Sequence, residues 1–195
     1  AVAKQFTEKL AARAKGLKVG DGLDKSVQIG PQVNASQIET STHYCRIARE
    51  EGAQILTGGH PLTEGAFANG HFFAATVVAG VKPKMRIAQE EVFGPVVSVL
   101  ECADFDEAIQ IANDIPFGLS TAIYTRNVNL AFRAMRDLEA GITYVNAPTI
   151  GAEVHLPFGG VKQTGNGHRE GGIGAIEFFT TWKAVYVDYS DKLQR

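Results

Sequence analysis

Two adjacent carboxylates and an aromatic ring stand before a Gly-Pro pair in the segment Glu90-Glu91-Val92-Phe93-Gly94-Pro95. A carboxylate accepts hydrogen bonds from a diol, such as the hydroxyls of a ribose. An aromatic face packs against a planar ring, and a rigid Gly-Pro turn would present both groups at a fixed angle. A helix end with surface acids and one buried Phe explains the same residues, so both readings stay open.

A second cluster joins Pro157-Phe158-Gly159-Gly160-Val161-Lys162 to the polar run 164–170, which holds His168, Arg169 and Glu170. Glycines permit close backbone approach. An ion-paired anchor is as plausible for Arg169 and Glu170 as a catalytic role. His168 belongs to no metal-ligand spacing, so no metal site is predicted.

Neither cysteine has the surroundings of an activated nucleophile. Cys45 lies inside a predicted helix beside Arg46, and neighbouring helical residues point about 100° apart. Cys102 follows Glu101, whose charge disfavours a thiolate. We expect both to be packed small hydrophobic residues.

Composition narrows the functional class. The 195 residues are 45% hydrophobic and 21% charged with a net charge of −2, typical of a globular protein. No basic run predicts nucleic-acid binding, and no apolar stretch approaches the ~20 residues that span a bilayer. Two cysteines in unrelated contexts imply no disulfide framework and favour a cytoplasmic setting.

Periodicity and cap signals predict alternating helices and strands. We expect helices ending near Gly16 and Gly52, opening at Asp104 and Asn127, and near 175–179, with strands at 55–56, 72–78, 96–100, 119–124 and 142–145. Asn34 with Gln37 has capping-box spacing. This pattern favours an α/β fold, a mostly parallel sheet covered by helices on both faces. A right-handed crossover would join 119–124 to 142–145.

The two ends of the chain carry further expectations. Ala1 lies directly inside an amphipathic helix whose apolar face is Val2, Phe6, Leu10 and Ala14, with no cap before it. A cut chain or a removed initiator Met would explain this start. At the other end, residues 182–189 alternate like a strand that needs a partner.

The clusters together resemble one family. Ordered in the chain are Gly30-Pro31-Gln32, Glu90 to Pro95, Asn113 with Pro116-Phe117-Gly118-Leu119, Gly141 to Asn146, and Pro157 to Lys162 with Gly165 and Arg169-Glu170. This set is similar to the C-terminal, catalytic-domain portion of the aldehyde dehydrogenase superfamily. The likeness covers essentially the whole chain.

The resemblance implies a role for each site residue. Glu91 would bind hydroxyls of the nicotinamide ribose of NAD or NADP, and Phe93 would pack beside the nicotinamide. Gln37 would lie near the adenosine ribose, in competition with its capping role. Phe158 would line the aldehyde pocket, and the loop 147–156, with Thr149 and Ile150, would gate substrate specificity.

The same resemblance implies covalent catalysis, in which a Cys thiolate attacks the aldehyde and a Glu-activated water hydrolyses the thioester. The segments that hold this Cys and Glu in the family are absent, as is the cofactor-binding half, so this chain alone is expected to be inactive. Residues 1–181 would be catalytic domain, and 182–195 an oligomerisation strand and tail that gives homodimers or homotetramers.

Details of the sequence point to a substrate class. The runs Asn146 to Thr149, Gly151 to Leu156 and Thr164 to Glu170 look like those of 2-oxoglutarate semialdehyde dehydrogenases of bacteria and archaea. Ala75, where the family usually has Pro, is a departure. The alternative is a non-catalytic assembly module of the same fold. The main hypothesis requires Glu91, Phe93 and Phe158 to converge on one cleft.

Overall fold

The computed structural model describes residues 2–192 and divides into two compact units, Ala1–Ile115 and Pro116–Arg195. The first residue and residues 193–195, part of the predicted tail, lie outside the described range. Among the described residues, no helix combines the length and apolar character needed to cross a membrane.

The first unit contains most of the regular structure. Its elements are α1 (Ala3–Lys15), α2 (Ala35–Glu50), β1 (Gln54–Thr57), β2 (Pro61–Leu62), the 3-10 turn η1 (Gly65–Phe67), β3 (Phe72–Phe73), β4 (Thr76–Val81), α3 (Arg86–Gln89), β5 (Val96–Leu100) and α4 (Phe105–Asn113).

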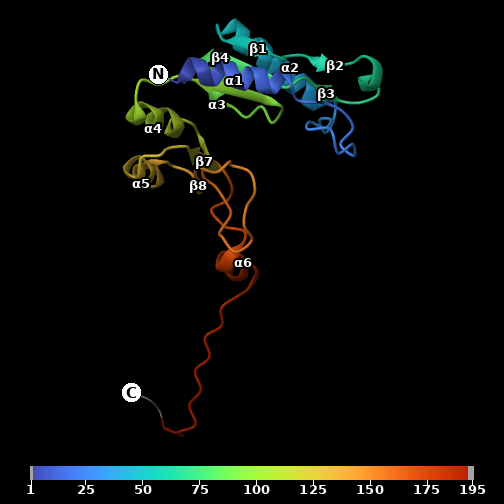
Figure 1. The fold of residues 1–195 in the computed structure, drawn as a ribbon. Coiled ribbons are helices and arrows are strands. Elements are labelled where there is room, and N and C mark those ends of the chain that lie inside the picture. Colours follow the sequence, from blue (N-terminus) through green and yellow to red (C-terminus); the bar gives the residue numbers. More distant parts are fainter. Residues whose placement is uncertain (1, 193–195) are drawn as a thin grey trace. The chain divides into compact units, whose positions relative to one another are not determined.

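A three-stranded sheet in the order β1-β4-β5 forms the centre of this unit. Strand β4 pairs with β1 in antiparallel and with β5 in parallel orientation. Four of its six residues are buried, and α1 packs against it (Figure 1), while α2 packs against β1. The core cluster is Ala48, Ala53, Val78, Val81 and Ile87.

Local cap chemistry sets where the helices begin. The Asn34 side chain accepts from the Gln37 amide at 2.9 Å, and the Asp104 side chain accepts from the Glu107 amide at 2.9 Å. These bonds satisfy amide groups that the first helical turn leaves without a partner. The predicted starts of α2 and α4 are therefore confirmed.

The second unit is built from short elements. They are β6 (Phe117–Gly118), β7 (Ser120–Ile123), α5 (Val128–Asp137), β8 (Ile142–Val145), β9 (Val161–Lys162) and α6 (Gly172–Phe179). Strands β7 and β8 pair with each other in parallel orientation and are connected by α5, as predicted. Strands β6 and β9 pair in antiparallel orientation.

The α/β class is confirmed, but the sheet differs from the expectation. The described strands form a three-stranded and three two-stranded sheets rather than one mostly parallel sheet. The predicted strand 72–78 is two strands, β3 and β4, with β3 paired to β2 in antiparallel orientation. The apolar run concealed this division because periodicity does not identify the pairing partner.

The predicted apolar face of α1 and the predicted strand 182–189 also differ from the structure. In α1 the buried residues are Thr7 and Ala14, whereas Val2 and Phe6 are exposed. No strand is assigned within residues 182–189, and Trp182 and Tyr186 are 86% and 95% exposed. A strand needs a neighbour to supply its hydrogen bonds, and within the described residues this segment pairs with none.

Candidate active site

The first part of the site is the segment Glu90–Pro95, which connects α3 to β5. The side-chain Nε2 of Gln37, in the first turn of α2, donates to the Val92 carbonyl at 2.8 Å. Val92 also packs against the core cluster. The middle of the segment is therefore anchored to the unit's interior through both the backbone and the side chain of Val92.

The two adjacent glutamates have different surroundings. Arg86 donates Nε and Nη2 to the two carboxylate oxygens of Glu90 at 2.7 Å each, and the Tyr44 hydroxyl donates to Glu90 at 2.6 Å. The hydrogen bonds from Arg86, followed by that from Tyr44, lower the pKa of Glu90 to about 2. Glu91 is exposed, and no ion pair involving it is found in the described part of the chain.

Phe93 has an unusual backbone and an unusual exposure. Its φ is +53°, a left-handed conformation that aromatic residues rarely adopt, and the residue is 77% exposed. The alternative of a buried Phe at a helix end is therefore wrong. Strained conformations persist where the surroundings fix them, and they cluster at functional sites.

Gly94 allows the segment to approach α2 closely. A Cβ placed on Gly94 would lie 2.5 Å from the Oγ of Ser41. Ser41 is fully buried, and its Oγ has no hydrogen-bond partner among residues 2–192. A side chain at position 94 would therefore require either Ser41 or the turn that carries Phe93 to shift.

These residues fit a nicotinamide nucleotide. Glu91 offers carboxylate oxygens to ribose hydroxyls, and Phe93 offers an exposed ring face to a planar base. Gln37, in α2, contacts the same segment, and its amide nitrogen is engaged with the Val92 carbonyl. Among residues 2–192, no cluster of three or more His, Cys, Asp or Glu side chains could hold a metal ion.

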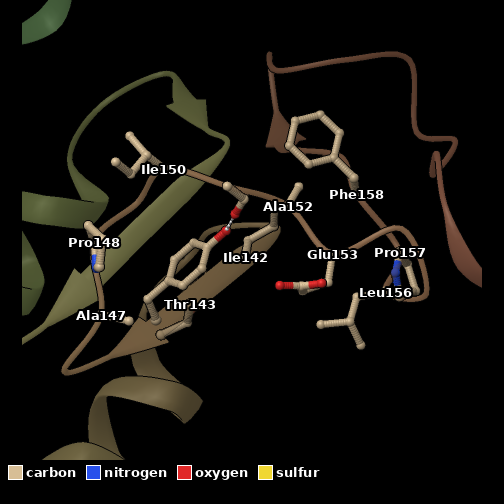
Figure 2. Close-up of a pocket in the computed structure, with 12 residues that line it drawn as sticks. Ile142, Thr143, Ala147, Pro148, Ile150, Ala152, Glu153, Leu156, Pro157 and Phe158 are labelled. Carbon is tan, nitrogen blue, oxygen red and sulfur yellow. Dashed lines mark hydrogen bonds between the residues drawn. The ribbon is translucent and has the colours of Figure 1, made fainter. Parts of the chain in front are cut away.

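A pocket of about 360 Å³ occupies the second unit (Figure 2). Its wall is mainly apolar and comes from β8 and the loop that follows, and it includes Ile142, Ile150, Leu156 and Phe158. Glu153 is the charged side chain of this wall. Ile150 and Phe158 thus lie together, whereas Thr149 belongs to the same loop but not to the wall.

The pocket loop is tied to the unit at several points. The Tyr144 hydroxyl donates to the Gly151 carbonyl at 2.6 Å. Phe158 and Glu170 form an antiparallel bridge through their backbones. Arg169 donates to the Gly160 carbonyl at 2.8 Å. Among the described residues Arg169 and Glu170 form no ion pair, so the expected ion-paired anchor is not found. The side chain of Arg169 and the backbone of Glu170 tie the loop instead.

Burial separates the two cysteines. Cys45 is fully buried as expected, and desolvation raises the pKa of its thiol. Cys102 is exposed, so the prediction of a packed small hydrophobic residue is wrong for it. It follows β5 at the start of a turn, and the sequence carried no periodic signal that could reveal this exposure.

Sequence reasoning missed several contacts of the site. The spacing of Arg86 and Glu90 is that of an i,i+4 ion pair and would have identified that contact. No local signal exists for Tyr44 with Glu90, which are 46 residues apart. Glu91 and Phe93 belong to the first unit and Phe158 to the second, so their convergence on one cleft stays a prediction.

Comparison with known proteins shows the family of this chain. The model of the "Aldehyde dehydrogenase family" matches residues 1–185. The chain is 44% identical over 185 residues to an alpha-ketoglutarate semialdehyde dehydrogenase of Haloferax volcanii and 38% identical over 184 residues to that of Bacillus subtilis. In each case the match covers 94% of this chain and 38% of the relative. The expected likeness to 2-oxoglutarate semialdehyde dehydrogenases is confirmed.

Solved structures also match nearly the whole chain. A variant of Staphylococcus aureus betaine aldehyde dehydrogenase, crystallised with NAD⁺, matches with a TM-score of 0.91 and 32% identity. That match covers 98% of this chain and 38% of the other. PnpE from Pseudomonas sp. WBC-3 matches with a TM-score of 0.92 and 35% identity, over 100% of this chain and 39% of its own. The chain thus spans well under half the length of these relatives.

Proposed function

Because the chain belongs to the aldehyde dehydrogenase family, we propose that it is part of an NAD- or NADP-dependent enzyme that oxidises an aldehyde to a carboxylate. The observation that carries this proposal is the pairing of an unneutralised carboxylate, Glu91, with an exposed ring at positive φ, Phe93. A purely structural loop has no need of either feature.

The proposed cofactor contacts belong to the first unit. Glu91 accepts hydrogen bonds from the nicotinamide ribose, and Phe93 packs beside the nicotinamide. Gln37 lies near the adenosine ribose and holds Val92 in place as well. When bound, the nicotinamide supplies a two-electron acceptor for the substrate carbon. The NAD⁺ in the S. aureus relative's crystals supports this cofactor class.

The proposed substrate is a semialdehyde, in keeping with the relatives from H. volcanii and B. subtilis. Phe158 and Ile150 line the apolar part of its pocket. Thr149 acts through the conformation of the loop. An apolar wall with few polar groups is typical of small-molecule sites.

The nucleophile and the general base belong, in this proposal, to sequence outside these 195 residues. A thiolate there would add to the aldehyde carbon, and the adduct would become a thioester by losing a hydride, for which the bound nicotinamide would be the acceptor. Water activated by a carboxylate would then release the acid and regenerate the thiolate. The raised pKa of the buried Cys45 thiol is the opposite of what a nucleophile requires. This chain alone is therefore expected to be inactive.

The domain division follows from the same proposal. Residues 1–181 form catalytic domain, and 182–195 an oligomerisation strand and tail that pairs with a second subunit. The exposure of Trp182, Tyr186 and Tyr189 supports this, because unpaired aromatic residues favour a partner. Light scattering of the full-length protein should report a dimer or tetramer, whereas a monomer would exclude that role.

An assay of the full-length protein tests the function. Reduction of NAD⁺ or NADP⁺ is followed at about 340 nm with 2-oxoglutarate semialdehyde, betaine aldehyde and simple aliphatic aldehydes. Glu91→Gln should raise the cofactor KM about tenfold by weakening a charge-assisted hydrogen bond. The control Glu101→Gln changes an exposed carboxylate elsewhere. Inactivity with every aldehyde would defeat the proposal.

A further inference from the structure

One carboxylate of the first unit accepts hydrogen bonds from side chains of two helices. Glu90 is the C-cap of α3, and Arg86 from the same helix binds both of its carboxylate oxygens. Tyr44 reaches the same carboxylate from α2. The Arg86 guanidinium also lies 5.8 Å from the centre of the Tyr44 ring, so the three side chains contact one another.

This cluster borders directly on the proposed cofactor residues. Glu90 is held by Arg86 and Tyr44, and Val92 is held by Gln37 and by the core. Glu91 and Phe93 alternate with these two anchors and are both exposed. Residues 90 and 92 are thus fixed to the unit, while residues 91 and 93 face outward.

We propose that Tyr44 and Arg86 are positioning residues that set the cofactor-binding orientation of Glu91 and Phe93 by holding Glu90. The proposal rests on the cofactor role proposed above for Glu91 and Phe93. Neither Tyr44 nor Arg86 needs to touch the cofactor. Their contacts neutralise Glu90 and leave Glu91 as the carboxylate with free acceptor capacity.

The physical reason lies in the backbone of Phe93. A φ of +53° is unfavourable for an aromatic residue and persists only where the flanking residues are held. Releasing Glu90 frees the residue that precedes Glu91, so both outward side chains sample other orientations. A hydrogen bond to an ionised group is about twice as strong as a neutral one, which makes this carboxylate an effective anchor.

The full-length protein with Tyr44→Phe, Arg86→Gln and Arg86→Lys tests the proposal. Arg46→Gln is a matched control because Arg46 also forms an i,i+4 pair, with Glu50 at 2.6 Å, on the exposed side of α2. The Phe variant keeps the ring and removes only the hydroxyl. The Lys variant keeps the charge and removes the bidentate geometry.

Three measurements report on the segment. Hydrogen exchange of the cofactor-free protein follows the Glu90 amide, bonded to the Arg86 carbonyl, and the Val96 amide, bonded to the Gly94 carbonyl. Calorimetry gives the Kd for NAD⁺, and steady-state kinetics gives the KM for NAD⁺ separately from that for the aldehyde.

We expect exchange at both amides to accelerate, and the Kd and KM for NAD⁺ to rise about three- to tenfold in Tyr44→Phe and Arg86→Gln. Arg86→Lys should recover part of this loss. The control Arg46→Gln should keep the wild-type exchange rates, Kd and KM for NAD⁺, and the KM for the aldehyde should be unchanged in every variant. An active wild type whose Tyr44 and Arg86 variants match Arg46→Gln would overturn this inference alone. A wild type that neither binds nor reduces NAD⁺ or NADP⁺ would overturn the proposed function with it.

Discussion

The Nε2 of Gln37 lies 2.8 Å from the carbonyl oxygen of Val92, 55 residues further along the chain. The backbone amide of the same Gln37 is capped by Asn34. The side chain therefore does not return to the cap as a capping box requires, and it supports the segment that carries Glu91 and Phe93 instead.

Replacing Gln37 by Leu should lower stability by about 1 kcal/mol, because the Val92 carbonyl loses a partner in a partly buried place. Urea unfolding of the full-length protein measures this change. Gln110→Leu, at an exposed position of α4, is the control. Equal losses in the two variants would contradict a specific role of Gln37.

A Cβ on Gly94 and the hydroxyl of Ser41 cannot occupy the same space. Gly94→Ala should cost about 1–3 kcal/mol, since its Cβ would lie 2.5 Å from the buried Ser41 Oγ. Ser41→Ala should be neutral or stabilising, because that Oγ has no hydrogen-bond partner in the described part of the chain. The double variant should regain most of the loss, because the Ser41 Cβ would be 3.6 Å away.

Denaturant unfolding of the four members of this cycle measures the coupling between the two sites. Gly16→Ala serves as the control, because a Cβ on Gly16 would lie 3.6 Å and 3.7 Å from its nearest neighbours, which is ordinary contact. Strictly additive effects of Gly94→Ala and Ser41→Ala would show that the predicted clash does not occur.

The pH dependence of stability should reveal the Glu90 anchor. In the folded protein the pKa of Glu90 is lowered from an ordinary 4.5 to about 2, chiefly by hydrogen bonds from Arg86. A lowered folded-state pKa adds stability that is complete above about pH 4.5 and is lost as pH falls toward 2. Wild type should therefore exceed Glu90→Gln in stability at pH 6, and the difference should shrink with acid.

Unfolding of both proteins between pH 6 and the lowest pH at which they stay folded measures that difference. Glu50→Gln, which breaks the exposed pair with Arg46, provides the comparison. A difference between wild type and Glu90→Gln that does not vary with pH would argue against the ion pair as its source.

Removing the hydroxyl of Tyr144 should loosen the pocket loop. Tyr144→Phe deletes the 2.6 Å bond to the Gly151 carbonyl and leaves the ring in place. We expect kcat/KM for the aldehyde to fall about three- to tenfold, the KM for NAD⁺ to stay constant, and Tyr124→Phe, at an exposed position, to have no effect. A change in the KM for NAD⁺ alone would show that the Tyr144 hydroxyl does not act through the aldehyde pocket.

Local signals were sufficient for much of the fold. Asn34 and Asp104 begin helices because each side chain caps an amide three residues later, a relationship contained within one turn. The parallel pair around α5 followed from strand–helix–strand periodicity. The division of the run 72–78 did not follow, because it depends on pairing with β2, a strand of two residues that is too short to show a period.

The sequence by itself determined the family, since an ordered set of motifs is far more specific than any one of them. The i,i+4 spacing links Glu90 to Arg86, but no local signal shows that Tyr44, 46 residues away, donates to the same carboxylate. Only the tertiary structure shows that Glu90 is held by side chains from two helices, whereas the carboxylate of Glu91 is exposed. The physical reason is that a carboxylate's charge and hydrogen-bonding capacity depend on the groups around it, and folding brings those groups from distant parts of the chain.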